Sequence, residues 1–330
     1  MNALSRIKDK ARSKKRRVVL PEGAEPRVIQ AAKKILSEEI AAVTLLGDEK
    51  KIEALAKEHG LNLGKVEVIN PVHSDDYNRF VQDFMDIRKA KGITEERARQ
   101  TMLNELHFGA MLVRNDKADA SVAGSVNTTG DVLRAAIQVI GLKPGINVVS
   151  SNFMMTVPKY RDEHDKVFLY ADGAVVPNPD AEQLASIAAA TAETMENLLG
   201  MEPRIAFLSF STKGSAKHAD VNKVIKAVEI FKRDFPQYKA DGELQVDAAI
   251  VPEIAARKAP ESDVEGNANV LVFPDLDAGN IAYKLTQRLA NATATGPIIQ
   301  GLAKPANDLS RGCSADDIVD VTAIAVLMKG

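Results

Sequence analysis

The stretch of sequence that decides the fold is residues 17–48, RVVLPEGAEPRVIQAAKKILSEEIAAVTLLGD. Its first apolar run, Arg17–Gly23, predicts a buried strand and the turn that leaves it. Helical periodicity follows from Arg27 to Ile40, and a second apolar run occupies Ala41–Asp48. Short buried strands that alternate with amphipathic helices are typical of a parallel sheet covered by helices, so we expect an α/β fold.

The same alternation continues along the chain. In the first half it predicts helices at 49–59, 75–91, 94–115 and from 129, and strands at 65–70 and 118–126. A second group, from about Ile146, has predicted strands at 147–155, 166–177, 204–210 and 269–275, and helices at 180–199, 219–234 and 277–291. Residues 245–258 are ambiguous, because Pro252 has to lie near a helix start or at a kink. A last helix is expected at 315–328.

The bulk composition is that of an ordinary globular protein. A chain of 330 residues suggests two domains, and a formal net charge of −2 gives no reason to expect nucleic acid or a membrane as a partner. The basic segment Met1–Arg17 is not followed by an apolar run, so we expect a solvated helix, not a signal peptide. The single cysteine, Cys313, excludes an internal disulfide and favours a cytoplasmic location. We expect it to be a small buried residue and not a nucleophile.

Common site motifs are missing from the sequence. It has no GxxxxGK[ST] phosphate loop, no GxGxxG dinucleotide fingerprint, no HExxH and no GxSxG, and its five histidines show no metal-ligand spacing. We therefore expect no bound metal and no permanently bound cofactor.

The densest cluster of polar groups is NDLSRGCSADD, residues 307–317. Arg311 can hold an anion with two parallel hydrogen bonds, and Ser310 and Asp317 add a hydroxyl and a carboxylate. Ser314 is a plausible N-cap of the last helix, with Asp317 in its first turn. The alternative interpretation is a capped helix start with no catalytic role.

Two further clusters follow predicted strands. In FSTKGSAKH, residues 210–218, the side chains of Ser211, Thr212 and Lys213 could form a phosphate cradle or a capped turn. In NTTGDVLRAA, residues 127–136, Thr128 and Thr129 precede a helix that carries Arg134. Arg88 and Arg27 are isolated cations near element ends, where either a ligand contact or a surface position is possible.

With these clusters the sequence resembles the phosphate acetyltransferase and phosphate butyryltransferase family, in its single-module form. The resemblance covers nearly the whole chain and is carried by seven segments in the expected order: LPEGAEPR (20–27), RKAKGIT (88–94), TTGDVLRAA (128–136), LSFSTKGSAKH (208–218), DGELQVDAAIVPEIAARKAP (241–260), NVLVFPDLDAGNIAYKL (269–285) and GPIIQGLAKPANDLSRGCSADDIV (296–319). Longer relatives carry an extra N-terminal region, so we expect the regulation it supplies to be missing here.

The resemblance implies a two-domain α/β/α architecture related to the isocitrate/isopropylmalate dehydrogenase-like fold, with mainly parallel sheets and an active site in the interdomain cleft. One domain would comprise residues 1–146 with 297–330, and the second, expected to dimerise, residues 147–296. It further implies a homodimeric cytoplasmic enzyme of acetate metabolism whose substrates are coenzyme A (CoA) or acetyl-CoA, acetyl phosphate and phosphate.

The resemblance places the catalytic residues on Ser310, Arg311 and Asp317. It implies that substrate is bound by cations and by hydroxyls near element ends, namely Arg88, Arg134, Arg27, Lys258, Thr128, Thr129, Ser211, Thr212 and Lys213. The implied reaction is acetyl transfer between CoA and phosphate by direct thiolate attack in a ternary complex. A propionyl or butyryl transferase with the same residues is one alternative, and a non-catalytic module that binds acetyl-CoA is another.

Overall fold

The structure, a computed structural model, describes residues 3–329. The chain divides into two compact units, each of which is described by itself. Unit 1 comprises Ala3–Lys143 and the C-terminal segment from Leu302, and unit 2 comprises Pro144–Gly301.

Unit 1 is built on a five-stranded sheet in the order β11-β4-β1-β2-β3. Every pair in this sheet is parallel, as the alternating pattern predicts. The C-terminal segment supplies an edge strand, with Asp308 opposite Ala123 in the register. The strands are β1 (Arg17–Leu20), β2 (Ala42–Leu46), β3 (Val66–Ile69), β4 (Ala120–Ala123) and β11 (Ala306–Asp308).

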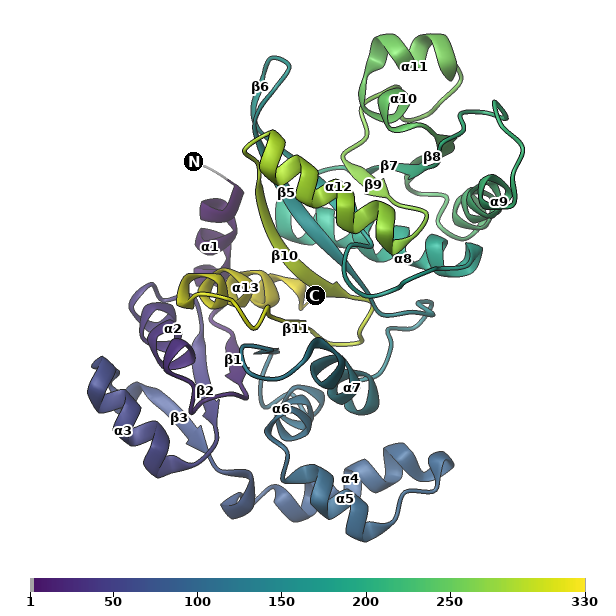
Figure 1. The fold of residues 1–330 in the computed structure, drawn as a ribbon. Helices are drawn as coiled ribbons and strands as arrows, with labels where there is room; N and C mark the ends of the chain where they lie inside the picture. The colour runs from purple at the N-terminus through teal and green to yellow at the C-terminus, as the bar shows by residue number, and fades with distance from the viewer. Residues whose placement is uncertain (1–2, 330) are drawn as a thin grey trace. The chain divides into compact units, whose positions relative to one another are not determined.

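Helices cover this sheet (Figure 1). They are α1 (Ala3–Lys14), α2 (Pro26–Ser37), α3 (Glu49–His59), α4 (Tyr77–Arg88), α5 (Glu95–Met102), α6 (Glu105–Arg114), α7 (Thr129–Val139) and α13 (Ala315–Met328), with short turns η1 (Leu63–Lys65), η2 (Pro71–His73) and η3 (Lys89–Lys91). Helix α13 packs against α1, α2 and β4, whereas α7 packs against α6 and β11.

Two expectations for unit 1 need correction. The single helix predicted for residues 94–115 is broken, because the Asn104 side chain accepts the backbone N–H groups of Leu106 and His107 and so begins α6 anew. The first helix is not solvated on all sides, since α1 buries Ile7 and Ala11 against α13.

Unit 2 contains a six-stranded sheet in the order β10-β5-β6-β9-β7-β8. Three of its five strand pairs are parallel, whereas β10 with β5 and β5 with β6 are antiparallel. The strands are β5 (Ser150–Tyr160), β6 (Glu163–Ala171), β7 (Arg204–Leu208), β8 (Lys239–Leu244), β9 (Val270–Val272) and β10 (Thr293–Gln300). The predicted α/β class with mainly parallel sheets is thus confirmed, with an antiparallel edge added.

The helices of unit 2 are α8 (Ala181–Thr194), α9 (Ala219–Asp234), α10 (Val246–Ile250), α11 (Pro252–Lys258) and α12 (Leu276–Leu289), with a π-helical turn η4 (Met195–Leu199) after α8. Pro252 begins α11, where the N–H that proline lacks would have no helical partner anyway. The segment that was ambiguous in the sequence is therefore two short helices.

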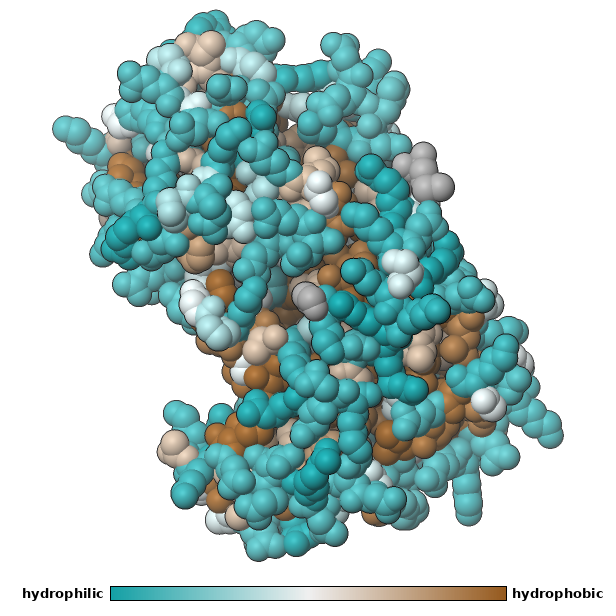
Figure 2. All heavy atoms as spheres, turned by 180° about the vertical axis from the view of Figure 1, so that it is seen from behind, coloured by the Kyte–Doolittle hydropathy of each residue, from teal (hydrophilic) through white to brown (hydrophobic). Residues whose placement is uncertain are grey.

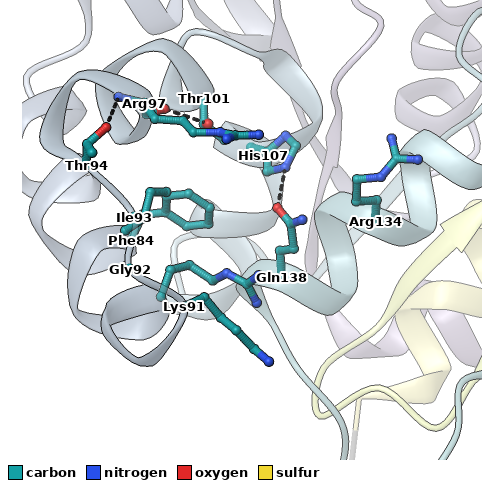
Figure 3. A pocket seen from close by; sticks show the side chains of 11 residues that line it. Phe84, Lys91, Gly92, Ile93, Thr94, Arg97, Thr101, His107, Arg134 and Gln138 are labelled. Atoms are coloured by element: carbon teal, nitrogen blue, oxygen red, sulfur yellow. Dashed lines mark hydrogen bonds between the residues drawn. The ribbon is translucent and has the colours of Figure 1, made fainter.

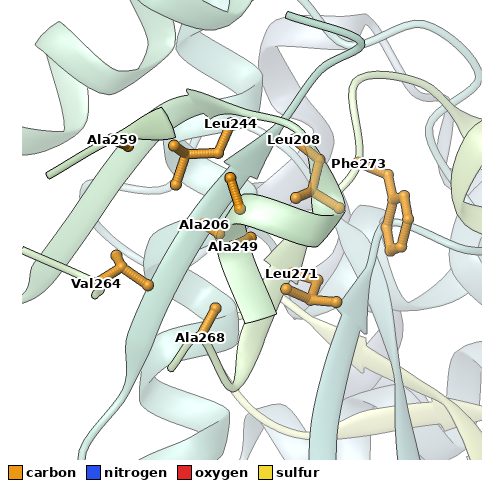
Figure 4. Close-up of a cluster of buried hydrophobic side chains, with 10 residues drawn as sticks. Ala206, Leu208, Leu244, Ala249, Ala259, Val264, Ala268, Leu271 and Phe273 are labelled. Atoms are coloured by element: carbon orange, nitrogen blue, oxygen red, sulfur yellow. The ribbon is translucent and has the colours of Figure 1, made fainter. Parts of the chain in front are cut away.

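Buried side chains of unit 2 gather where α10 and the loop after α11 cover β7, β8 and β9 (Figure 4). Leu208, Leu244 and Leu271 are at most 5% exposed there.

On the molecular face drawn in Figure 2, hydrophilic residues predominate and hydrophobic ones form smaller patches. Between residues 3 and 329, no helix has the length and apolar character to cross a membrane.

Candidate functional site

A loop leads from β11 into α13. It carries Ser310 and Arg311, two of the predicted catalytic residues, and the third, Asp317, lies in the first turn of α13. Ser310 Oγ accepts the Gly312 N–H at 3.2 Å, and the Cys313 N–H donates to the Ser310 carbonyl at 2.9 Å. Ser314 caps α13 together with Asp317, as predicted: Asp317 Oδ2 accepts both the N–H and the hydroxyl of Ser314 at 2.8 Å. The capped helix start of the alternative interpretation is therefore present in the structure.

Arg27 holds this loop in place. Its guanidinium donates to the carbonyl oxygens of Arg311 at 2.8 Å and Cys313 at 2.9 Å. It also donates to the Ser125 carbonyl at 2.9 Å and to Glu25 Oε1 at 2.6 Å. The N–H groups of Arg27 thus donate to three backbone carbonyls and one carboxylate, and these hydrogen bonds join the 310–313 loop to the loop after β4.

Two polar groups, one in this loop and one in the first turn of α13, have no partner in residues 3–329. The Arg311 side chain is exposed and forms no hydrogen bond or ion pair there, and Asp317 Oδ1 is likewise without a hydrogen bond. A guanidinium that follows Ser310 in the sequence and a carboxylate oxygen in the first turn of α13 are thus without a partner in the described chain. Cys313 is buried, and burial raises the pKa of its thiol although the Arg27 charge lowers it, so this thiol is not an activated nucleophile.

Glu22, in the turn after β1, is a site residue that sequence reasoning missed. Its Oε2 accepts the N–H groups of Gly124 at 3.0 Å and Ser125 at 2.7 Å, and its Oε1 those of Val126 at 3.0 Å and Asn127 at 2.8 Å. Burial alone would raise the pKa of Glu22, but the hydrogen bonds from Ser125, Asn127 and Val126 together lower it. The ionised side chain therefore fixes the loop that precedes α7.

The predicted hydroxyls at the start of α7 have distinct partners. Thr128 is the N-cap and accepts the Asp131 N–H at 3.2 Å. Thr129 donates to Asp308 Oδ2 at 2.6 Å, which links α7 to the end of β11. Arg134 lies one turn into α7 and pairs with Asp131 at 2.6 Å, with 60% of its side chain exposed.

Arg88 and Arg134 line one cavity of about 520 Å³ in unit 1 (Figure 3). Lys91 and Arg97 add two more cations to its wall, and Phe84 and Ile93 add apolar surface. Within the described part of the chain, none of Arg88, Lys91 and Arg97 forms an ion pair with a carboxylate. A cavity with this wall suits an anion that carries an apolar or aromatic group.

His107 lies in the same wall and was not singled out from the sequence. Its Nε2 faces Gln138 Oε1 at 3.3 Å and its Nδ1 faces Asn104 Oδ1 at 3.0 Å. Burial lowers the pKa of His107, the Gln138 hydrogen bond raises it, and the Arg134 charge lowers it further. Nothing in its position within α6 distinguishes it in sequence from a core histidine.

Unit 2 contains the other predicted binding residues. Ser211 Oγ and the Gly214 N–H both donate to Glu243 Oε1 at 2.8 Å. Lys213 pairs with Asp241 at 2.6 Å. These donors of the predicted phosphate cradle are thus engaged with carboxylates of β8.

Thr212 and Lys258 meet on one residue of unit 2, Gln245. Thr212 Oγ1 accepts the Gln245 N–H at 2.9 Å, and Lys258 Nζ donates to Gln245 Oε1 at 2.9 Å and to Asp247 Oδ2 at 2.8 Å. The two residues form one polar cluster, and their contact with substrate stays a prediction.

Known proteins resemble this chain over nearly its whole length. The family model described as "Phosphate acetyl/butaryl transferase" matches residues 2–326. A phosphate acetyltransferase of Thermoanaerobacterium thermosaccharolyticum is 52% identical over 323 residues, which cover 98% of each chain. A phosphotransacetylase structure from Streptococcus pyogenes has a TM-score of 0.93 and 42% identity, and covers 98% of this chain and 97% of that one.

A more distant structure bears on the fold alone. The 4-hydroxythreonine-4-phosphate dehydrogenase of Klebsiella pneumoniae has a TM-score of 0.54 at 11% identity, covering 96% of this chain and 100% of that one. This likeness agrees with the predicted relation to a dehydrogenase fold.

The family match over nearly the full length, with the high identity of the relatives, shows that this chain belongs to the phosphate acetyl/butaryl transferase family.

Proposed function

We propose that the chain is a phosphate acetyltransferase, which moves an acetyl group reversibly between CoA and inorganic phosphate. The observation that carries this proposal is the 310–313 loop, anchored by Arg27, which carries Ser310 and an unpartnered Arg311 side chain and leads into the first turn of α13, where Asp317 Oδ1 has no hydrogen bond in the described chain. The 52% identical relative, a phosphate acetyltransferase, supports the same activity.

The chemistry of these groups fits a direct transfer. When CoA attacks acetyl phosphate, the new C–S bond forms as Asp317 takes the thiol proton, because a free thiol with a pKa of about 8.5 is mostly protonated at neutral pH. Arg311 stabilises the oxyanion of the tetrahedral intermediate, and Ser310 hydrogen-bonds the reacting group. The C–O bond to phosphate then breaks and phosphate leaves. No covalent enzyme intermediate is needed, since both substrates are held together.

The cation-lined cavity between α4, α5, α6 and α7 has a separate task in this proposal. At about 520 Å³ it is larger than an inorganic phosphate ion needs. Its mixture of cations with Phe84 and Ile93 suits a phosphate-bearing part of CoA. Arg88 and Arg134 are therefore proposed as CoA ligands, and the contacts of Lys258, Ser211, Thr212 and Lys213 with substrate stay predictions.

Removing a cation from this cavity should weaken CoA binding more than turnover. We expect Arg88→Ala to raise KM for CoA about 10- to 100-fold, since a charge-assisted hydrogen bond contributes roughly 1.5–3 kcal/mol. Arg134→Ala should lie near the lower limit, because Arg134 already pairs with Asp131. Steady-state kinetics at varied CoA concentration measure this.

The matched control is Arg99→Ala. Arg99 lies on α5 like Arg97 but pairs with Glu95 at 2.8 Å and does not line the cavity. Its removal should leave KM for CoA within about twofold. Equal KM values for all three variants and the parent enzyme would place CoA elsewhere.

One assay tests the activity itself. Purified protein is mixed with CoA and either acetyl, propionyl or butyryl phosphate, with no added nucleotide or redox cofactor, and thioester absorbance is followed. Acetyl phosphate should give the highest kcat/KM. A higher value for butyryl phosphate would make the chain a butyryl transferase, and no turnover with any of the three would make it a non-catalytic binding module.

The same proposal includes a homodimer formed through α12. Ile281, Leu285 and Leu289 are spaced by four residues on this helix and are 57%, 52% and 80% exposed. Residues four apart share one helix face, so they form an exposed apolar stripe. We place the dimer in the cytoplasm, where the lone thiol of Cys313 stays reduced.

A charge on the stripe should therefore dissociate the dimer. We expect Leu285→Glu with Leu289→Glu to give a monomer by size-exclusion chromatography with light scattering, whereas the parent protein is a dimer. Val72→Glu is the control, because Val72 is also exposed, at 61%, but lies in unit 1. A parent protein that is itself monomeric, or a double variant that stays dimeric, would contradict the assigned interface.

A further inference from the structure

Asp308 is a buried carboxylate that the chemistry above does not use. It ends β11, directly before Leu309 and Ser310, and is 2% exposed. Its Oδ2 accepts the Thr129 hydroxyl at 2.6 Å, whereas the buried Oδ1 has no hydrogen-bond partner within residues 3–329. An unpaired buried carboxylate oxygen raises the free energy of the folded state, so its presence next to the loop of Ser310 calls for a physical explanation.

Asp308 lies where two loops of the site meet. The Leu309 N–H donates to the Ala123 carbonyl at 2.8 Å, and the chain after β4 turns at Gly124 with φ +114°. A Cβ at Gly124 would collide with the Asp308 carboxylate and lie 2.6 Å from the Leu309 nitrogen. The segments around Asp308 are thus packed too closely to move independently.

We propose that Asp308 is a positioning residue, which holds the amino end of α7 against the loop of Ser310 and Arg311 through the Thr129 hydroxyl. Asp308 contacts no reacting atom in this proposal. Only Leu309 separates Asp308 from Ser310. A shift of α7 relative to β11 would therefore move the loop that carries Ser310 and Arg311. The inference rests on the proposed function for the role of the loop in catalysis. The hydrogen bond between Thr129 and Asp308 is a property of the fold and does not depend on that function.

The protonation of Asp308 makes its hydrogen bond with Thr129 depend on pH. Burial raises its pKa to about 6, although the Thr129 hydroxyl and the Leu309 N–H lower it, and the Glu22 charge adds to the rise. A carboxylate accepts a hydroxyl proton more strongly than a neutral carboxyl group does. The contact with Thr129 therefore strengthens as pH rises through about 6.

Few other charges bear on Asp308. Glu22 faces it from the turn after β1, and β4, with the sequence ASVA, carries no charged residue. On α7, Asp131 and Arg134 pair with each other. The carboxylates of α13 are bound by other groups, namely Asp316 by Lys34, Asp317 by Ser314 and Asp320 by Lys8.

The first test removes only the hydroxyl. Thr129→Val keeps the shape of the side chain, and we expect kcat to fall about tenfold while KM for CoA changes less than twofold, as the loss of one hydrogen bond allows. Thr129→Ser restores a hydroxyl and should recover most of the lost kcat. Equal kcat values for the valine and serine variants would overturn the proposal.

The second test follows pH. The parent enzyme should lose kcat as pH falls through about 6, and Asp308→Asn should lack this acid limb, because an amide does not ionise. Asp119→Asn is the control: Asp119 precedes β4 at its other end and pairs with Lys329 at 2.7 Å, so its replacement should keep the limb. An unchanged acid limb in Asp308→Asn would refute the role of Asp308.

The third test needs no activity. A carboxyl group whose pKa is raised in the folded state stabilises the fold at low pH, and that contribution is lost as pH rises through the folded-state pKa. The Tm of Asp308→Asn relative to the parent should therefore increase between pH values of about 5 and 7.5, measured without substrate. A constant difference would overturn the inference. A rising difference in a protein without acetyl transfer would overturn the proposed function alone.

Discussion

Arg311→Gln should lower kcat for acetyl transfer about 10²- to 10³-fold, with a smaller change in either KM. The Arg311 guanidinium is exposed and has no partner within residues 3–329, so the folded protein does not use it for stability. Its charge is needed most when the oxyanion forms next to an already anionic phosphate group. An interaction made mainly in the transition state affects kcat, and rapid-mixing or steady-state kinetics in both directions measure it.

Two variants separate the charge of Arg311 from the position of its loop. Arg311→Lys keeps the charge but loses the planar fork, so its kcat should lie between those of the parent and Arg311→Gln. Arg27→Lys keeps Arg311 but weakens the hydrogen bonds to the carbonyls of residues 311 and 313. An Arg311→Gln enzyme with parental kcat and a raised KM for phosphate would instead make Arg311 a ground-state ligand.

Local patterns predicted the parts of this site that depend on neighbouring residues. The N-cap at Ser314 follows from a short polar side chain placed directly before an apolar helix, and the start of α7 was likewise expected near Thr129. The strand–helix alternation predicted the parallel sheet of unit 1, and the hydroxyls of residues 128 and 129 were expected after the strand at 118–126. Both signals lie within a few residues of the feature that they predict.

Contacts between distant segments could not be predicted in this way. Asp308 meets Thr129 across 179 residues, and Glu22 meets the loop after β4 across 102 to 105 residues. Each of these carboxylates has an ordinary local sequence, and only the packing of β11, β4 and β1 makes it a partner of that loop or of α7. The break at Asn104 was missed for a related reason, since an asparagine inside a helical pattern is an N-cap only if the chain turns there.

Asp317→Asn should reduce kcat about 10²- to 10³-fold near neutral pH and recover part of the loss as pH rises. The structure allows Asp317 two roles at once, because Oδ2 caps α13 through Ser314 and Oδ1 is without a hydrogen bond in the described chain. An asparagine keeps one oxygen for the cap but cannot take a proton. Free CoA thiolate accumulates toward its pKa of about 8.5 and then reacts without a base.

The comparison that decides between these roles is kcat against pH for Asp317→Asn, Ser314→Ala and the parent. Ser314→Ala weakens the cap, at a cost of about 1 kcal/mol in stability, but keeps the carboxylate, so its pH profile should match the parent's. A gain at alkaline pH in Asp317→Asn alone identifies Asp317 as the base. If instead the Asp317→Asn profile differs from the parent's by a constant factor, the carboxylate serves the helix start, where its bond to Ser314 fixes the loop that presents Arg311.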